Sequence, residues 1–197
     1  MTIIREEKIA DVAARETLLD EAYGAARFAK TSERLREGRL PARGLSLVAV
    51  ECRRLVGTVR LWNVAAGPGR DVLLLGPLAV HPDCRNRGIG KALMRRAIAR
   101  ARFAGHGAIL LVGDLAYYGR FDFSAASTGE LWMPGRYERD RLLALELKPG
   151  ALAGARGLIS PTGTVALKPD LNALIAAKPA AKPATSGKRR VPIRRAA

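Results

Sequence analysis

The sequence predicts a mixed α/β or α+β domain, and two observations support this prediction. Segments with a helical spacing of apolar residues alternate with β-rich runs, in the order two helices, three strands, helix, strand, short helix, strand. The chain has 197 residues, of which 48% are hydrophobic and 5% aromatic, so one full core with appendages can form. The order of elements shows no internal repeat.

Two helices are expected in the N-terminal third. Residues 10–26 place apolar side chains near helical spacing, and Asp11 is available as the N-cap. A shorter helix is expected over residues 31–37, ending at Gly38.

Three β-rich runs follow these helices. Residues 45–51 and 54–62 predict an antiparallel hairpin around a charged turn at Arg53 and Arg54. Residues 71–82 are apolar throughout, as expected of a strand buried on both faces. Pro77 lies inside this run and cannot donate a ladder hydrogen bond, so it predicts a bulge or an unpaired edge.

The second half of the chain continues the alternation. Residues 88–105 keep apolar side chains on one stripe and basic ones on the rest, which predicts a helix ended by its last glycine. Residues 107–114 read as a short buried strand, and residues 114–121 as a short helix with Asp114 as N-cap. Residues 141–147 alternate as a closing strand.

The stretch RNRGIGK, residues 85–91, predicts an anion site between a buried strand and a helix. N–H groups at a helix start lack partners, and the helix dipole adds about 0.3–1 kcal/mol for a nearby negative charge. Gly88 and Gly90 remove side chains that would keep a diphosphate away. The counter-charge is supplied by three basic residues of the stretch: Arg85, Arg87 and Lys91.

Two nucleotide-binding loops are excluded by the same stretch. A Walker loop requires glycine and Ser/Thr at the positions of Arg85 and Ala92. A dinucleotide fingerprint would place glycine at the position of Leu93, and it normally follows the first strand of a βαβ unit.

The pattern Arg/Gln-x-x-Gly-x-Gly/Ala is met by Arg85, Gly88 and Gly90, and it resembles the acyl-CoA-binding motif of the GNAT superfamily of N-acyltransferases. In that family the loop amides grip the coenzyme A pyrophosphate. DLAYYGRFDF, residues 114–123, is similar to the second signature, an aromatic pair followed by Gly-Phe. The chain looks most similar to the YhbS-like bacterial predicted acetyltransferases.

The resemblance implies the GNAT fold over residues 1–160: a mixed, mostly antiparallel sheet flanked by helices, with a splayed strand pair that holds acyl-CoA. It implies N-acetyl transfer from acetyl-CoA to an amine, without a metal. Tyr118 would be the general acid, with Tyr117 as the fallback. The implied cofactor-binding residues are Leu78, Ala79, Val80, Arg85, Asn86, Arg87, Gly88, Ile89, Gly90, Lys91, Asp114 and Tyr117.

Two features depart from the family pattern or leave it incomplete. Asp122 stands where the family usually has glycine, although Asp tolerates a positive φ better than most residues. No general base is assigned, because Glu51, His81 and Glu130 are all available and none is marked by a motif.

The acceptor and the oligomeric state, monomer or homodimer, stay open. In this fold the acceptor surface comes from variable segments, here residues 24–44 and 128–141, whose arginines hint at an acidic or phosphorylated acceptor. A non-catalytic acyl-CoA-binding regulatory module is the first alternative function. The second is a polyanion- or nucleic-acid-binding protein that acts through a basic tail.

The net charge of +16 is distributed unevenly, with +8 in residues 1–150 and +8 in residues 151–197. We expect an extension over residues 161–177 and a disordered basic tail over residues 178–197, which could contact polyanions weakly. No apolar run approaches the ~20 residues of a membrane span, and a cytoplasmic protein is expected. The only two cysteines are read as buried or idle thiols.

Overall fold

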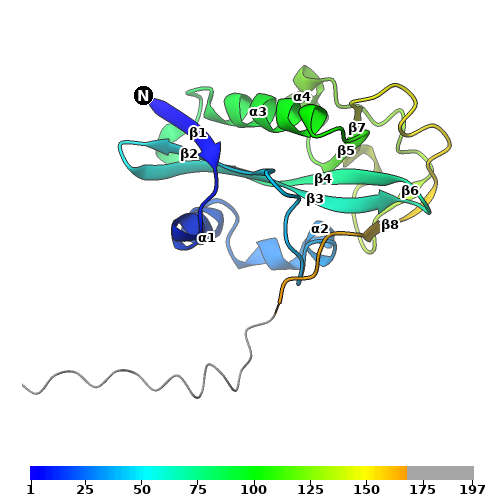
Figure 1. Cartoon of the computed structure of the whole chain (residues 1–197), viewed down its shortest axis with the longest axis horizontal. Helices are drawn as coiled ribbons and strands as arrows, with labels where there is room; N and C mark the ends of the chain where they lie inside the picture. The colour runs from blue at the N-terminus through cyan, green and yellow to red at the C-terminus, as the bar shows by residue number, and fades with distance from the viewer. Residues whose placement is uncertain (168–197) are drawn as a thin grey trace, which may run out of the picture. The chain divides into compact units, whose positions relative to one another are not determined.

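The computed structural model describes residues 1–167, and Met1–Ala166 form one compact unit. Within these residues the strands form an eight-stranded sheet in the order β1-β2-β3-β4-β5-β7, with β8 pairing to β3 and to β6 (Figure 1). All pairs are antiparallel except β4–β5 and β6–β8. The strands are β1 (Thr2–Glu6), β2 (Ser46–Glu51), β3 (Arg54–Ala66), β4 (Asp71–Val80), β5 (Ala108–Val112), β6 (Leu131–Trp132), β7 (Leu142–Glu146) and β8 (Gly157–Pro161).

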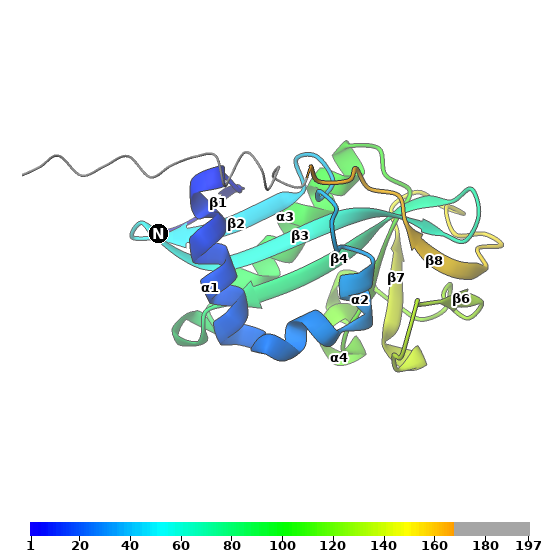
Figure 2. The same cartoon turned by 90° about the horizontal axis from the view of Figure 1, so that it is seen from below.

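Helices cover both faces of this sheet. Figure 1 shows α1 and α2 below the strands and α3 and α4 above them, and Figure 2 shows α1 crossing the sheet. The α-helices are α1 (Val12–Tyr23), α2 (Thr31–Arg34), α3 (Ile89–Phe103) and α4 (Leu115–Tyr118). The short 3-10 helices are η1 (Ile9–Asp11), η2 (Ala25–Ala29), η3 (Pro82–Cys84), η4 (Gly119–Phe121) and η5 (Arg139–Arg141). Within residues 1–167, none of the helices has the length and apolar composition of a membrane span.

The core divides between the two faces because side chains alternate along each strand. On β2, Leu47 packs into the cluster that includes α3, whereas Val48 packs against Leu18 and Leu19 of α1. A Cβ added at Gly57 of β3 would lie 2.9 Å from Leu93 Cδ1 of α3, so this glycine lets the helix approach the sheet closely.

Strand β4 carries the irregularity predicted from Pro77. Val59 of β3 pairs with Leu78, but Leu61 pairs with Leu75, so Gly76 and Pro77 together oppose one residue of β3. The predicted bulge is confirmed. On its other edge β4 pairs with β5 only at Leu73 and Leu74, so the two parallel strands diverge beyond that point.

Several elements differ from the sequence prediction. β1, β6 and β8 were not expected, and the hairpin turn falls one residue early, at Cys52 and Arg53, which both have positive φ. Asp11 does not cap α1, which is a correction: its carboxylate accepts the Lys8 N–H at 2.7 Å and the two Arg5 Nη groups instead. The expected domain boundary at residue 160 falls inside β8. The predicted tail, residues 178–197, and most of the predicted extension lie outside the described residues.

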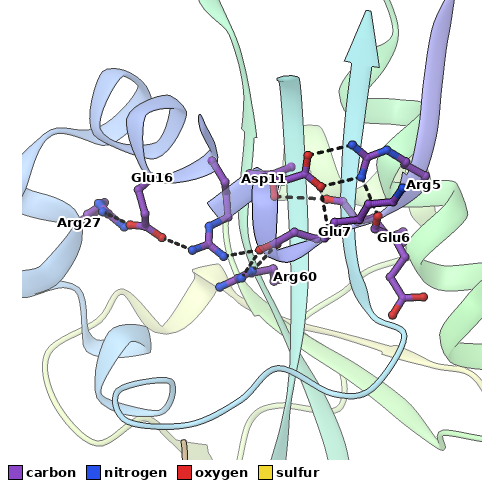
Figure 3. Close-up of polar contacts among 11 residues, drawn as sticks. Arg5, Glu6, Glu7, Asp11, Glu16, Arg27 and Arg60 are labelled. Atoms are coloured by element: carbon purple, nitrogen blue, oxygen red, sulfur yellow. Dashed lines mark hydrogen bonds and ion pairs between the residues drawn. The ribbon is translucent and has the colours of Figure 1, made fainter. Parts of the chain in front are cut away.

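A buried ion network joins β1, α1 and β3 (Figure 3). The Glu7 carboxylate accepts hydrogen bonds from Arg15 at 2.7 Å and from Arg60 at 2.6 and 2.9 Å. The side chains of Glu7 and Arg15 are 5% and 6% exposed. Burial raises the pKa of the Glu7 carboxyl, and the charge of Arg15 opposes that shift. The network continues from Arg15 through Glu16 to Arg27, so it spans α1.

We predict that Glu7→Gln lowers the free energy of unfolding by about 3 kcal/mol, because the buried Arg15 and the partly buried Arg60 guanidinium groups lose the charge of their shared carboxylate. Urea unfolding measures this difference. Glu6→Gln is the matched control: the neighbouring side chain is 56% exposed and its contact with Arg100 is 3.5 Å long, so a change below about 0.5 kcal/mol is expected. Equal losses in both variants would contradict the assigned role of Glu7.

A second prediction concerns the acid stability of the β1–α1 connection. The hydrogen bond from Arg5 lowers the pKa of Asp11 to about 2. A folded-state pKa below the unfolded one stabilises the protein above the unfolded pKa near ~3.9, and this contribution disappears as the pH falls towards 2. At pH 7 the free energy of unfolding should therefore be lower for Asp11→Asn than for the wild type. Unfolding curves recorded at several pH values should show this difference shrinking between pH 4 and pH 2. A pH-independent difference would refute this assignment.

Candidate functional site

A cleft of about 720 Å³ lies where β4 and β5 diverge. The end of β4, the loop before α3, the start of α3 and α4 supply most of its lining. Further lining residues come from α1, the segment before α2, the end of β5 and the segment before β7. Among the predicted site residues, the lining includes Leu78, Ala79, Val80, Arg85, Asn86, Gly88, Ile89, Gly90, Lys91, Asp114, Tyr117 and Tyr118. The structure therefore brings these residues, which span 41 positions of the sequence, to one cleft.

Arg87 is the predicted site residue that lies outside this lining. Its guanidinium donates to the Glu51 carboxylate at 2.7 Å and to the Cys84 sulfur at 3.6 Å. Arg87 thus braces the loop against the end of β2. The basic residues of the stretch that line the cleft are Arg85 in the loop and Lys91 in the first turn of α3.

The loop before α3 has a shape that presents backbone N–H groups to the cleft. Asn86 and Gly88 adopt positive φ, 60° and 78°, and Gly88 is the N-cap of α3. The N–H groups of the first helical turn have no carbonyl partners within the helix. Because Arg85 and Lys91 flank them, the helix start is a site for an anion.

Gly90 has a second role that the motif alone does not reveal. A Cβ at this position would lie 2.8 Å from the Tyr117 hydroxyl oxygen and 3.6 Å from Val80 Cγ2. The absence of a side chain at Gly90 therefore lets Tyr117 of α4 approach the start of α3 across the cleft.

The cleft side of β4 offers backbone groups without a strand partner. Leu78, Ala79 and Val80 pair with β3 on one edge, but pairing with β5 ends at Leu74. The Leu78 carbonyl accepts a hydrogen bond from the Tyr23 hydroxyl, which reaches it from the end of α1. Tyr23 was missed in the sequence, since no local motif marks a side chain whose partner is 55 positions away.

Two tyrosines of α4 form the wall opposite β4. The rings of Tyr117 and Tyr118 meet edge to face, with centroids 4.9 Å apart. A Cβ at Gly113 would lie 2.2 Å from the Tyr118 ring, so this glycine makes room for it. Burial raises the pKa of Tyr118 far above its ordinary value, and the nearby hydroxyls of Tyr23 and Tyr117 reinforce the shift. Tyr118 therefore keeps its proton at neutral pH.

Two local predictions about the α4 region are confirmed. The Asp114 carboxylate caps α4 by accepting the Ala116 N–H at 2.9 Å. Asp122 has φ 66°, so it takes the left-handed conformation in place of glycine. This turn directs Phe123 into the core, where its ring lies 6.1 Å from that of Tyr118.

The three acidic or basic groups considered as general base lie elsewhere. Glu51 is held by Arg87, and His81 Nδ1 accepts the Asp83 N–H at 3.2 Å, which caps the turn that follows β4. Glu130 lines a separate cavity of about 420 Å³. Among the described lining residues of the cleft, the one carboxylate is that of Asp114, which is occupied as a helix cap.

This geometry suits an extended anionic ligand. Phosphate groups fit at the start of α3, an amide-containing chain can run along the unpaired edge of β4, and a protonated tyrosine hydroxyl lies beyond it. The described residues contain no group of three or more His, Cys, Asp or Glu side chains able to hold a metal ion.

Comparisons with known proteins agree with this geometry. Residues 12–123 match the model of the acetyltransferase (GNAT) family. The structure is similar to the GNAT family N-acetyltransferase YhbS from Escherichia coli in complex with CoA, with TM-score 0.70 and 28% identity over 81% of this chain and 89% of that chain. A GNAT family acetyltransferase from Brucella melitensis in complex with acetyl-CoA has TM-score 0.56 and 28% identity over 85% and 96% of the two chains. The comparison with curated protein sequences found no match.

Proposed function

The chain belongs to the acetyltransferase (GNAT) family, and from this membership we propose that it transfers an acetyl group from acetyl-CoA to an amine. The observation that carries the proposal is the cleft between β4 and β5, which combines an anion-binding helix start, an unpaired strand edge and a buried tyrosine. The neighbours crystallised with CoA and acetyl-CoA support the choice of donor.

In the proposed complex, the N–H groups at the start of α3 and the side chains of Arg85 and Lys91 bind the pyrophosphate. The backbone of Leu78, Ala79 and Val80 holds the pantetheine arm as an added strand would be held. A β4 N–H at the thioester oxygen would stabilise the developing oxyanion, an effect of roughly 3–4 kcal/mol for one donor in other enzymes.

The chemical step joins an unprotonated amine to the thioester carbon. The amine first loses its ammonium proton to water, and its nitrogen then forms the C–N bond of a tetrahedral intermediate. Collapse breaks the C–S bond, and Tyr118 donates its proton to the departing sulfur. The amide nitrogen releases its second proton to solvent, and the tyrosinate is reprotonated from solvent.

A non-catalytic acyl-CoA-binding module is the competing function, and the cleft without a free carboxylate favours it. One measurement distinguishes the two functions. Release of free CoA thiol is followed over a mixed panel of amines, peptides and aminoacyl compounds with acetyl-CoA present. Amine-dependent release supports the enzyme; binding of acetyl-CoA without release over the whole panel supports the module.

We predict that acetyl-CoA raises the melting temperature of the wild type and that Gly90→Leu abolishes this shift. The new side chain would collide with Tyr117 and fill the cleft beside Val80. Thermal unfolding with and without millimolar acetyl-CoA measures both effects. Gly129→Leu is the matched control, since a Cβ there meets nothing within 4 Å and the position lies outside the cleft. An unchanged wild-type melting temperature would overturn the donor assignment.

We predict that Tyr118→Phe leaves the Kd for acetyl-CoA within about twofold and lowers kcat by about 10²-fold or more, because the sulfur loses its proton donor. Since the pKa of Tyr118 is raised, the acid form persists through pH 9, and any loss of rate on the alkaline side below that pH comes from another group. Tyr117→Phe is the control and should retain most of kcat. A normal kcat for Tyr118→Phe would remove Tyr118 from the mechanism.

A further inference from the structure

Helices α1 and α2 cover one face of the sheet (Figures 1 and 2), and the cleft is lined there by residues at the end of α1 and just before α2. There its lining includes Tyr23 at the end of α1, Lys30 before α2, and Arg141 before β7. We call these three residues the acceptor rim. The predicted pyrophosphate site lies at the start of α3, on the other face, so the rim is the part of the cleft that a bound donor leaves for the second substrate.

The acceptor rim is built from two chain segments that are fixed to each other. Thr31 Oγ1 donates to the Arg136 carbonyl, and Arg34 Nη1 donates to the Pro134 carbonyl at 2.8 Å. The backbone of Arg141 is anchored as well, because its carbonyl accepts the Gly113 N–H at 2.9 Å. The rim is therefore a preformed part of the fold.

Positive charge accumulates at the rim. The Lys30 ammonium lies 4.3 Å above the Tyr23 ring, and burial together with the charges of Arg36 and Arg141 lowers the pKa of Lys30. Arg36 is 7% exposed, and its Nη1 lies 3.9 Å from a Cβ position at Gly76 beneath the β4 bulge. These like charges repel one another in the absence of an anion.

The protein supplies little counter-charge at this point. Lys30 has no ion pair within residues 1–167, and the contact of Arg141 with Glu138 is 3.4 Å long and joins side chains that are 47% and 75% exposed. Arg36 has Glu33 at 3.3 Å. Of the charged residues that line the whole cleft, Lys30, Arg85, Lys91, Arg120 and Arg141 are basic, and Asp114 is acidic.

We propose that the acceptor amine carries an anionic group, a carboxylate or a phosphate, which Lys30 and Arg141 bind beside the Tyr118 hydroxyl. This inference rests on the proposed acetyl transfer. The guanidinium of Arg141 offers paired N–H groups that match either oxyanion, and Lys30 adds a compact charge. An anion held there neutralises the rim and leaves the amine of the same molecule directed into the cleft.

The test uses matched amines that differ in the anionic group. For the carboxylate arm, phenylalanine is compared with phenylalaninamide; for the phosphate arm, O-phosphoethanolamine is compared with ethanolamine. CoA release gives kcat and KM for each amine. In parallel, the melting temperature of the CoA complex is measured with each amine, so that binding is read without turnover.

We expect at least tenfold higher kcat/KM for the anionic member of one pair, and a larger thermal shift of the CoA complex with that member. Lys30→Gln and Arg141→Gln should each raise KM for it at least fivefold and leave the Kd for acetyl-CoA unchanged. Arg95→Gln, an exposed charge removal on α3 outside the cleft, is the control and should change neither quantity. Salt should raise KM for the anionic amine alone.

Three results would overturn the proposal. In both pairs, the amine without the anionic group could be acetylated or bound just as efficiently as its anionic counterpart, while acetyl transfer itself persists. The preference for the anion could survive in both Lys30→Gln and Arg141→Gln. Finally, CoA and acetyl-CoA could fail to bind at all, in which case the proposed function falls together with the inference. The first two outcomes leave the acetyl-transfer proposal standing, so the two failures are distinguishable.

Discussion

The site depends on one constraint, which is that β4 can pair with β5 over only two residues. Gly76 and Pro77 insert an extra residue against β3, and beyond this bulge the strand no longer follows β5. A parallel pair that continued would satisfy its own backbone groups and close the sheet. Because it stops, the last residues of β4 keep an unpaired edge within the domain, where a ligand can take the place of a strand.

The Glu7 network determines which side chains meet this edge from below. Helix α1 buries only two leucines and one arginine, so apolar packing alone holds it weakly. The carboxylate of Glu7 ties Arg15 of α1 to Arg60 of β3, and Arg60 is the residue opposite the β4 bulge. The same contact therefore fixes the helix whose last residue, Tyr23, bonds to Leu78. Stability of the helix and shape of the cleft are coupled through these few atoms.

Sequence reasoning succeeded where the cause of a feature is local. The turn at residues 85–91, the Asp114 cap, the positive φ of Asp122 and the bulge at Pro77 all follow from the chemistry of adjacent residues. Sequence reasoning failed where a feature depends on a contact with a residue far away in the sequence. β8 pairs with β3 across about a hundred positions, and the Tyr23 hydroxyl bonds to the Leu78 carbonyl 55 positions away. Neither pairing leaves a periodic signal in the sequence.

The cationic lining also bears on how an amine could react without a nearby carboxylate base. An ammonium group in the cleft near Lys30 and Arg141 would be disfavoured by like-charge repulsion, so its pKa would fall and the free amine would become more abundant at neutral pH. For an amine with pKa near ~10.4, deprotonation at pH 7 costs about 4–5 kcal/mol, and each unit of depression recovers about 1.4 kcal/mol. A cation-rich cleft would normally repel a positively charged substrate. An anionic group on that substrate removes this penalty by neutralising Lys30 and Arg141, which then hold the acceptor, while the cations of the lining that it leaves unpaired are the ones that still favour the free amine.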